Sequence, residues 1–170
     1  MRLLAIVVTA TLSSATAVGQ DWAIQPIAIP TRWSAEVAPS NALPEYPRPQ
    51  LVRRDWTNLN GLWQYAITSK DASPPDEYGG TILVPYPIES GLSGVRRELK
   101  PDECLWYRRS LTLPARRPST RTLLHFGAVD YEAAVYVNGR QVGSHAGGYE
   151  AWRRPGAFRE RVCRGGLKGA

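Results

Sequence analysis

The sequence is poor in the residues that mark several common classes of protein. It has two cysteines, two histidines and one methionine among its 170 residues. Two cysteines are too few for a disulfide-dense scaffold, and neither histidine has further ligand residues at zinc-site spacing. We therefore expect no metal site and no cofactor. We also expect Cys104 to be a buried thiol, with a disulfide to Cys163 as the less favoured alternative.

The sequence also lacks an apolar run of membrane-spanning length. The stretch from Leu3 to Leu12 has about half of the roughly 20 residues that a spanning helix needs. With Arg2 before it and the small residues of Ala15-Thr16-Ala17 after it, this stretch is typical of an export signal. We expect residues 1–17 to be a signal peptide, cleaved before Val18. The mature chain is then secreted or periplasmic, with no membrane anchor.

Positive charge is unevenly distributed along the chain. The formal net charge is +6. Residues 151–170 hold six Arg and Lys residues and one Glu, a net of +5, which leaves +1 for residues 1–150. A nearly neutral domain has no basic face of the kind that binds nucleic acid. We therefore expect no nucleic-acid partner.

No stretch of the sequence shows a sustained helical period with capping residues. Short alternating or β-rich runs are instead separated by turn residues. The runs that we expect to be strands are Leu62–Ile67, Thr81–Val84, Leu105–Leu113, Thr122–Phe126, Ala133–Val137 and Gln141–Ser144. Asn138-Gly139 predicts a hairpin between the last two runs, because both turn positions need a positive φ. The pattern predicts an all-β protein, an antiparallel β-sandwich of the jelly-roll type.

Four longer blocks of sequence are more specific than these single strands. They are YPRPQLVRRDWTNLNGLWQYAI (Tyr46–Ile67), VPYPIESGLSGV (Val84–Val95), LWYRRSLTLP (Leu105–Pro114) and LLHFGAVDYEAAVYVNGRQVGSHAGGYE (Leu123–Glu150). In content and order the blocks resemble the N-terminal sugar-binding domain of glycoside hydrolase family 2, the β-galactosidase and β-glucuronidase family. The resemblance covers residues 31–150 and implies a galactose-binding-like jelly roll. In the family, an immunoglobulin-like domain and a (β/α)₈ barrel follow this domain.

The resemblance implies a carbohydrate partner, a glycoside, and a role as the sugar-binding domain of a secreted glycoside hydrolase. In the family, two barrel glutamates about 5 Å apart act as acid/base and nucleophile. Nothing in this chain matches the barrel motifs, so no catalytic residue is assigned and the chain alone is expected to be inactive. Its partners are then the missing immunoglobulin-like and barrel domains of a parent enzyme. A free-standing, lectin-like carbohydrate-binding module is the alternative.

The chain divides into four segments. After the signal peptide, residues 18–50 form a Pro-rich extended arm, because repeated proline blocks helix. Residues 51–150 form the jelly roll, and residues 151–170 form an atypical basic tail without alternation, so we expect the C-terminal strands of the sandwich to be missing. We hypothesise that the tail is read out of frame from a longer gene, with a genuine basic tail that binds an acidic partner as the alternative. Translating the downstream DNA in the other two frames distinguishes the two hypotheses, because only the first predicts an immunoglobulin-like or barrel continuation there.

Six residues are candidates for the rim of a sugar site. They lie in the glycine-bearing loop of the second block or near strand ends of the last block, and they are Glu89, Ser90, Asp130, Tyr131, His145 and Tyr149. Loops at the end of a sandwich are where binding groups collect. The alternative for the first loop is a structural turn held by Gly91 and Gly94. The alternative for Asp130 is a turn residue that satisfies backbone donors, which we favour.

Overall fold

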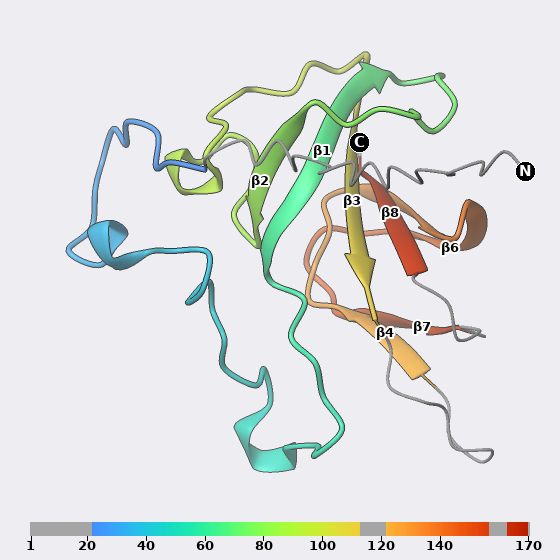
Figure 1. The fold of residues 1–170 in the computed structure, drawn as a ribbon, viewed down its shortest axis with the longest axis horizontal. Helices are drawn as coiled ribbons and strands as arrows, with labels where there is room; N and C mark the ends of the chain where they lie inside the picture. The colour runs from blue at the N-terminus through green and yellow to red at the C-terminus, as the bar shows by residue number, and fades with distance from the viewer. Residues whose placement is uncertain (1–21, 113–121, 157–162, 170) are drawn as a thin grey trace, which may run out of the picture.

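The computed structural model describes residues 22–112, 122–156 and 163–169 (Figure 1). This part of the chain contains strands and short 3₁₀ helices but no α-helix, and no helix in it is long and apolar enough to cross a membrane. The elements are η1 (Ser34–Glu36), η2 (Pro49–Leu51), β1 (Gly61–Ser69), β2 (Gly80–Val84), η3 (Gly91–Ser93), β3 (Glu103–Leu111), β4 (Thr122–Phe126), β5 (Glu132–Val137), β6 (Arg140–Ala146), β7 (Trp152–Gly156) and β8 (Cys163–Gly169). The predicted signal peptide lies outside the described residues.

The strands form two antiparallel sheets. The larger sheet has six strands in the order β2-β1-β3-β8-β5-β6, and the smaller sheet pairs β4 with β7. Figure 1 shows β4 and β7 together beside one end of the larger sheet. The predicted all-β, antiparallel fold class is confirmed. Five of the six runs expected to be strands lie within a strand, and the sixth, Leu105–Leu113, overlaps β3, which ends at Leu111.

The β5–β6 hairpin forms as its turn residues predict. Asn138 has a φ of 52° and Gly139 a φ of 78°, and Val137 pairs with Arg140 directly before and after them. Both turn residues are therefore in the left-handed region that a two-residue hairpin requires, and asparagine and glycine adopt it at low cost.

One core lies on the face of the larger sheet that carries alternate residues of β1 and β3. Trp63, Ile82, Ile88 and Leu105 form its buried cluster, and Tyr65 packs against it. Trp63 and Tyr65 are two positions apart on β1 and therefore share this face. Burying a large apolar side chain contributes about 1.5–3 kcal/mol, so this cluster fixes the strand register, because a one-residue slip would expose it.

The opposite face of the same sheet holds a second buried aromatic residue. Trp106 is only 1% exposed, and its Nε1 donates to Oγ1 of Thr68 on β1 at 2.9 Å. Its ring also lies 5.8 Å from that of Tyr136 on β5. The sheet therefore buries side chains on both faces around β3.

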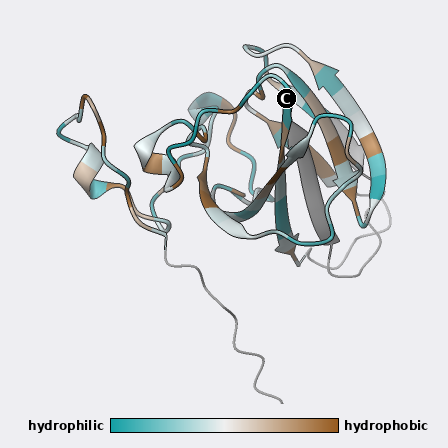
Figure 2. Ribbon diagram, turned by 90° about the horizontal axis from the view of Figure 1, so that it is seen from above, coloured by the Kyte–Doolittle hydropathy of each residue, from teal (hydrophilic) through white to brown (hydrophobic). Residues whose placement is uncertain are grey.

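The arm extends beyond β2, as Figures 1 and 2 show, and contacts the rest of the domain at two places. Near β1, the side-chain amides of Asn58 and Asn60 donate to the carbonyl of Leu43 at 2.9 and 3.0 Å.

The other contact is at the η3 turn. Trp22 Nε1 donates to the carbonyl of Ser93 at 3.0 Å, and the amide of Gln25 donates to the carbonyl of Gly91 at 2.9 Å. A Cβ on Gly91 would lie 2.6 Å from the Gln25 carbonyl oxygen. This close approach of two backbones is what glycine permits at that position.

The expectation that the C-terminal strands are missing is wrong. Trp152–Gly156 forms β7 and Cys163–Gly169 forms β8, both within residues 151–170. β8 lies between β3 and β5 and pairs with both. A strand is held by backbone N–H and C=O groups, which every residue except proline supplies. An open position between two strands can therefore be filled by a segment without side-chain alternation.

Candidate functional site

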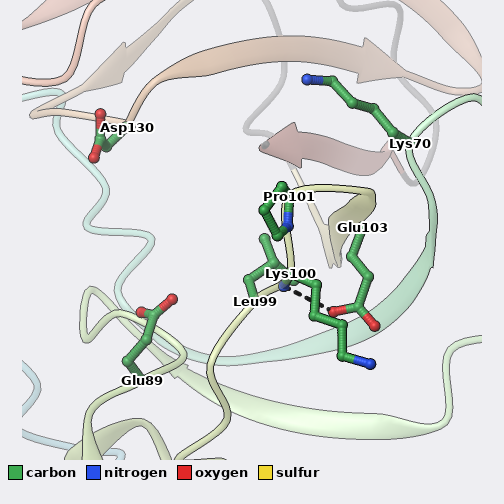
Figure 3. Close-up of a pocket in the computed structure, with 7 residues that line it drawn as sticks. All are labelled: Lys70, Glu89, Leu99, Lys100, Pro101, Glu103 and Asp130. Atoms are coloured by element: carbon green, nitrogen blue, oxygen red, sulfur yellow. Dashed lines mark hydrogen bonds between the residues drawn. The ribbon is translucent and has the colours of Figure 1, made fainter.

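A shallow, open hollow of about 450 Å³ lies between the loops of the larger sheet (Figure 3). Its lining mixes carboxylates, ammonium groups and apolar side chains, and consists of Lys70, Glu89, Leu99, Lys100, Pro101, Glu103 and Asp130. Figure 3 shows Glu89 and Asp130 on one side of the hollow and Lys100 and Glu103 on the other. Two of the six predicted rim residues, Glu89 and Asp130, therefore line one depression.

The carboxylates of the hollow differ in what holds them. Glu103 accepts from Arg97 at 2.6 Å and from the amide of Lys100 at 3.1 Å. Within the described part of the chain, Glu89 and Asp130 make no side-chain hydrogen bond or ion pair, and both residues are exposed. These two carboxylates are therefore the ones available to accept hydrogen bonds from a hydroxyl-rich ligand.

Two neighbouring loops bring the other candidates together. The amide of Gly147 donates to the carbonyl of Tyr131 at 2.8 Å, which ties the β6–β7 loop to the β4–β5 loop. A Cβ on Gly148 would lie 2.5 Å from Oδ1 of Asp130. Asp130 therefore packs directly on the loop that carries Tyr149.

The aromatic and imidazole groups of these loops differ in exposure. Tyr131 is 60% exposed and Tyr149 is fully exposed. His145 is half-buried, stacks on Trp152 with 4.9 Å between ring centroids, and has its Nε2 3.7 Å from Oε1 of Glu150. The tyrosines can therefore meet a ligand from solvent, whereas His145, on β6, is held against Trp152 of β7.

The loop that carries Glu89 and Ser90 is an ordered turn. Oγ of Ser90 accepts from the amide of Leu92 at 3.2 Å and so caps η3, and Gly94 ends η3 with a φ of 85°. Burial raises the pKa of the Tyr107 phenol, and the nearby Glu89 carboxylate raises it further. The Ser90 hydroxyl thus has a local structural role, and Glu89 is the side chain of this loop that faces the hollow.

Comparison with known proteins shows which proteins the chain is similar to. No family model matches it. It is 33% identical to dog (Canis lupus familiaris) β-glucuronidase over 135 residues, which are 71% of this chain and 20% of the dog protein. It is also 33% identical to cat (Felis catus) β-glucuronidase over 119 residues, 61% of this chain and 18% of the cat protein.

Solved structures agree with the curated relatives. Faecalibacterium prausnitzii β-glucuronidase superposes with a TM-score of 0.53 at 26% identity, over 66% of this chain and 20% of that one. The chain matches part of a family 2 glycoside hydrolase of the β-glucuronidase type. Bifidobacterium dentium β-glucuronidase shares the fold, with a TM-score of 0.53 at 24% identity, over 65% of this chain and 19% of that one. The chain spans about a fifth of the length of the relatives that it matches.

Arg109 is a residue of the β-glucuronidase-like sandwich whose importance the sequence reasoning missed. Its Nη1 donates to the carbonyls of Leu59 at 2.6 Å and Asn60 at 3.0 Å, and burial lowers its pKa. The guanidinium thereby fastens β3 to the segment that leads into β1. The signal in the sequence was its alternation with Leu105 and Tyr107, which places a charge on the core face of a strand.

An aromatic and basic surface lies at the smaller sheet. The Trp56 ring is 4.9 Å from that of Tyr46 and 5.5 Å from that of His125. His125 pairs across β4 and β7 with Arg153. Burial, and then the charges of Arg53, Arg153 and Arg48, lower the pKa of His125.

The described residues hold no group of three or more His, Cys, Asp or Glu side chains suited to a metal ion.

Proposed function

We propose that this chain forms the sugar-binding domain of an exported β-glucuronidase-type enzyme. The observation that carries the proposal is the 33% identity over 135 residues to the dog enzyme. The antiparallel sandwich of the described residues supports it. The Bifidobacterium dentium relative was solved with coumarin-3-O-glucuronide, so a β-glucuronide is the ligand class that we propose for the parent enzyme.

The proposed rim is formed by exposed groups around the hollow. Tyr131 and Tyr149 offer exposed rings, onto which the apolar face of a pyranose can pack. The carboxylates of Glu89 and Asp130 can accept from its hydroxyls. His145 has a supporting role through its stack on Trp152, and Ser90 supports Glu89 by capping η3.

A chimera tests this role. Residues 51–150 replace the matching domain of the Faecalibacterium prausnitzii enzyme, and hydrolysis of 4-nitrophenyl β-glucuronide is measured. We expect the chimera to be active. We expect Asp130→Ala to lower its kcat/KM about tenfold, the effect of losing one hydrogen bond of about 1.4 kcal/mol. Asp71→Ala, at an exposed residue outside the hollow, is the matched control. A folded, soluble chimera without activity would contradict the proposal.

The chain by itself is proposed not to hydrolyse glucuronides. A retaining glycosidase needs two carboxylates about 5 Å apart, one of them a proton donor, and the family resemblance places that pair in the barrel. We expect no turnover of 4-nitrophenyl β-glucuronide by the purified chain from a host that lacks this enzyme. Turnover that copurifies with the chain through two chromatographic steps would refute the assignment.

We also propose that the chain is exported through residues 1–17. The support is the order of charge, apolar stretch and small residues in the sequence. The mass of the chain recovered from the periplasm or medium is expected to correspond to a first residue Val18. Recovery only from the cytoplasm, with Met1 retained, would count against export.

A further inference from the structure

β8 joins the two halves of the larger sheet. It pairs with β3 from Leu105↔Gly169 to Leu111↔Cys163, and with β5 from Ala133↔Gly169 to Val137↔Gly165. Without it, β2-β1-β3 and β5-β6 would be separate ladders. The position between β3 and β5, which we call the slot, is therefore a complete binding position for one antiparallel strand.

The slot offers an apolar inner face to whichever segment occupies it. Leu105 is 5% exposed, and Ala133 and Val135 are 4% and 1% exposed. By register, Leu105 and Ala133 lie beside position 169, while Tyr107 and Val135 lie beside position 167. Positions 167 and 169 of the occupant thus lie between apolar or aromatic neighbours on both sides, whereas position 165 lies between Arg109 and Val137.

The segment that fills the slot has no side chain at half of the inner-face positions, because Cys163 and Leu167 alternate there with two glycines. Three of the seven residues of Cys163–Gly169 are glycine, at positions 165, 166 and 169. Two of these, positions 165 and 169, belong to the inner face by alternation. Glycine lacks the side chain that cross-strand pairs need, and it has more freedom to lose than any other residue. At these two positions β8 is therefore held in the slot by backbone pairing alone.

The outer face of the slot sets a different requirement. The rings of Trp106 on β3 and Tyr136 on β5 lie 5.8 Å apart although β8 runs between their strands. Strands in a sheet are about 4.8 Å apart, so these rings lean toward each other across the backbone of β8. Position 166 pairs with Arg108 and Tyr136, and glycine there leaves room for the rings.

We propose that the slot is a strand-acceptor site, which binds an extended peptide with apolar side chains at alternate positions in place of β8. Such a ligand adds the cross-strand pairs that the glycines of β8 omit, and it keeps a glycine beneath the two rings. This is recognition by strand addition, with backbone hydrogen bonds for affinity and alternate side chains for specificity. Because β8 belongs to the same chain, its effective concentration at the slot is in the millimolar range. The ligand must therefore bind the slot more tightly than β8 does, through its side chains.

Two labelled peptides of seven residues test the proposal on the intact chain. The first has valine at the positions aligned with 165, 167 and 169, glycine at 166, and threonine or lysine elsewhere. The second has the same composition and keeps glycine at 166, with the valines of 165 and 169 moved to 164 and 168, which turns them to the other face. Fluorescence anisotropy is expected to show at least tenfold tighter binding of the first peptide. Equal affinities, or no binding of either peptide at 1 mM, overturn the proposal.

A photo-crosslinking group at the position aligned with 167 identifies where the peptide lies. We expect attachment to β3 and β5, near Tyr107 and Val135. Attachment to β2 or β6 would show binding at an outer edge of the sheet, which overturns the proposal.

A variant that weakens β8 completes the test. Gly166→Pro removes an amide donor from the centre of the strand, and we expect it to raise the affinity for the first peptide about tenfold. Gly127→Ala is the control, because a Cβ on Gly127 meets nothing within 4 Å, and its affinity should equal that of the unmodified chain. A folded Gly166→Pro chain with unchanged affinity overturns the proposal. If circular dichroism shows that this variant is unfolded, the proposal is judged by the two peptides and the crosslink on the unmodified chain.

Discussion

At the scale of single residues, the charged groups inside the sandwich act as fasteners. Arg109 reaches two backbone carbonyls across the core face of β3. Hydrogen bonds from a charged donor to buried acceptors are worth more than neutral ones, and the acceptors lose them together if the donor is removed. The position of β1 relative to β3 therefore depends on a side chain that the sequence shows only as an interruption of an apolar pattern.

Replacing Arg109 should be costly for stability. We expect Arg109→Gln to lower the free energy of unfolding by about 2 kcal/mol, because the carbonyls of Leu59 and Asn60 lose a charged donor. Urea denaturation followed by tryptophan fluorescence measures the change. Arg140→Gln, at an exposed position in the β5–β6 turn, should stay within about 0.5 kcal/mol of the unmodified chain. Equal effects of both substitutions would contradict the fastening role.

His125 should titrate below its ordinary pKa of 6.5, because burial and three nearby arginines disfavour the imidazolium. Its cross-strand neighbour Arg153 is one of the three, so Arg153→Gln should raise the pKa of His125. An NMR titration of the His125 ring protons measures both values. An unchanged pKa in the variant would show that the guanidinium is too distant or too well screened to act.

The lowered pKa of His125 also determines whether stability rises or falls with pH. Below about pH 6.5 the unfolded chain takes up a proton at His125 more readily than the folded chain. Stability should therefore fall as the pH drops from 6.5 toward the folded pKa, and His125→Gln should remove this part of the decline. Urea denaturation at pH 7.5 and pH 5 compares the two chains.

At the scale of elements, the η3 turn connects the arm to the sandwich. Gly91 lets the backbone of Gln25 approach, and Gly94 takes the left-handed conformation against the ring of Trp22. Ser90 and Ser93 hold the turn from within through hydrogen bonds to its own backbone. The arm thus docks on a turn that is also held by its own hydrogen bonds.

Adding one methyl group to this turn should loosen the arm. In Gly91→Ala the Cβ would meet the Gln25 carbonyl oxygen at 2.6 Å and Cγ1 of Ile27 at 2.9 Å. We expect a loss of about 1–3 kcal/mol, the usual cost of overpacking, together with faster tryptic cleavage after Arg32. Gly127→Ala is the control in open space. A Gly91→Ala chain with unchanged stability and cleavage rate would show that the arm does not need this contact.

At the scale of the whole molecule, the larger sheet depends on a segment close to the end of the sequence. β8 lies at the centre of the sheet, whereas the strands that carry the buried cluster, β1 to β3, come much earlier in the chain. The strands that carry the buried cluster and the strand that joins the two halves of the sheet are therefore supplied by segments far apart in the sequence.

This division predicts unequal protection from hydrogen exchange. Amides on β3 that face β1 should exchange slowly, and amides on β5 that face β8 should exchange at least tenfold faster, because a glycine-rich strand opens more easily than a packed one. Amide exchange of the intact chain, resolved by NMR, compares the two sets. Uniform protection across both ladders would show that β8 is as firmly held as β1.

The sequence predicted the strands that have their own side-chain pattern and failed for those that do not. Alternating or β-rich runs predicted β1 to β6, and Asn138-Gly139 predicted the hairpin, because residue pattern and turn chemistry are local properties. β7 and β8 have neither signal, and they form because β4, β3 and β5 offer partners. Among the rim candidates, spacing alone did not show that Ser90 caps a turn or that His145 stacks on Trp152.

The sequence by itself determined the fold class and the family resemblance, because strand period, turn residues and ordered motif blocks are all present along the chain. Tertiary structure alone decided which loops meet, with Glu89 and Asp130 facing one hollow although 41 positions separate them. It also decided that residues 163–169 enter the centre of the sheet. The physical reason is that backbone pairing depends on which strands are left without a neighbour, and this depends on the whole arrangement rather than on any one segment.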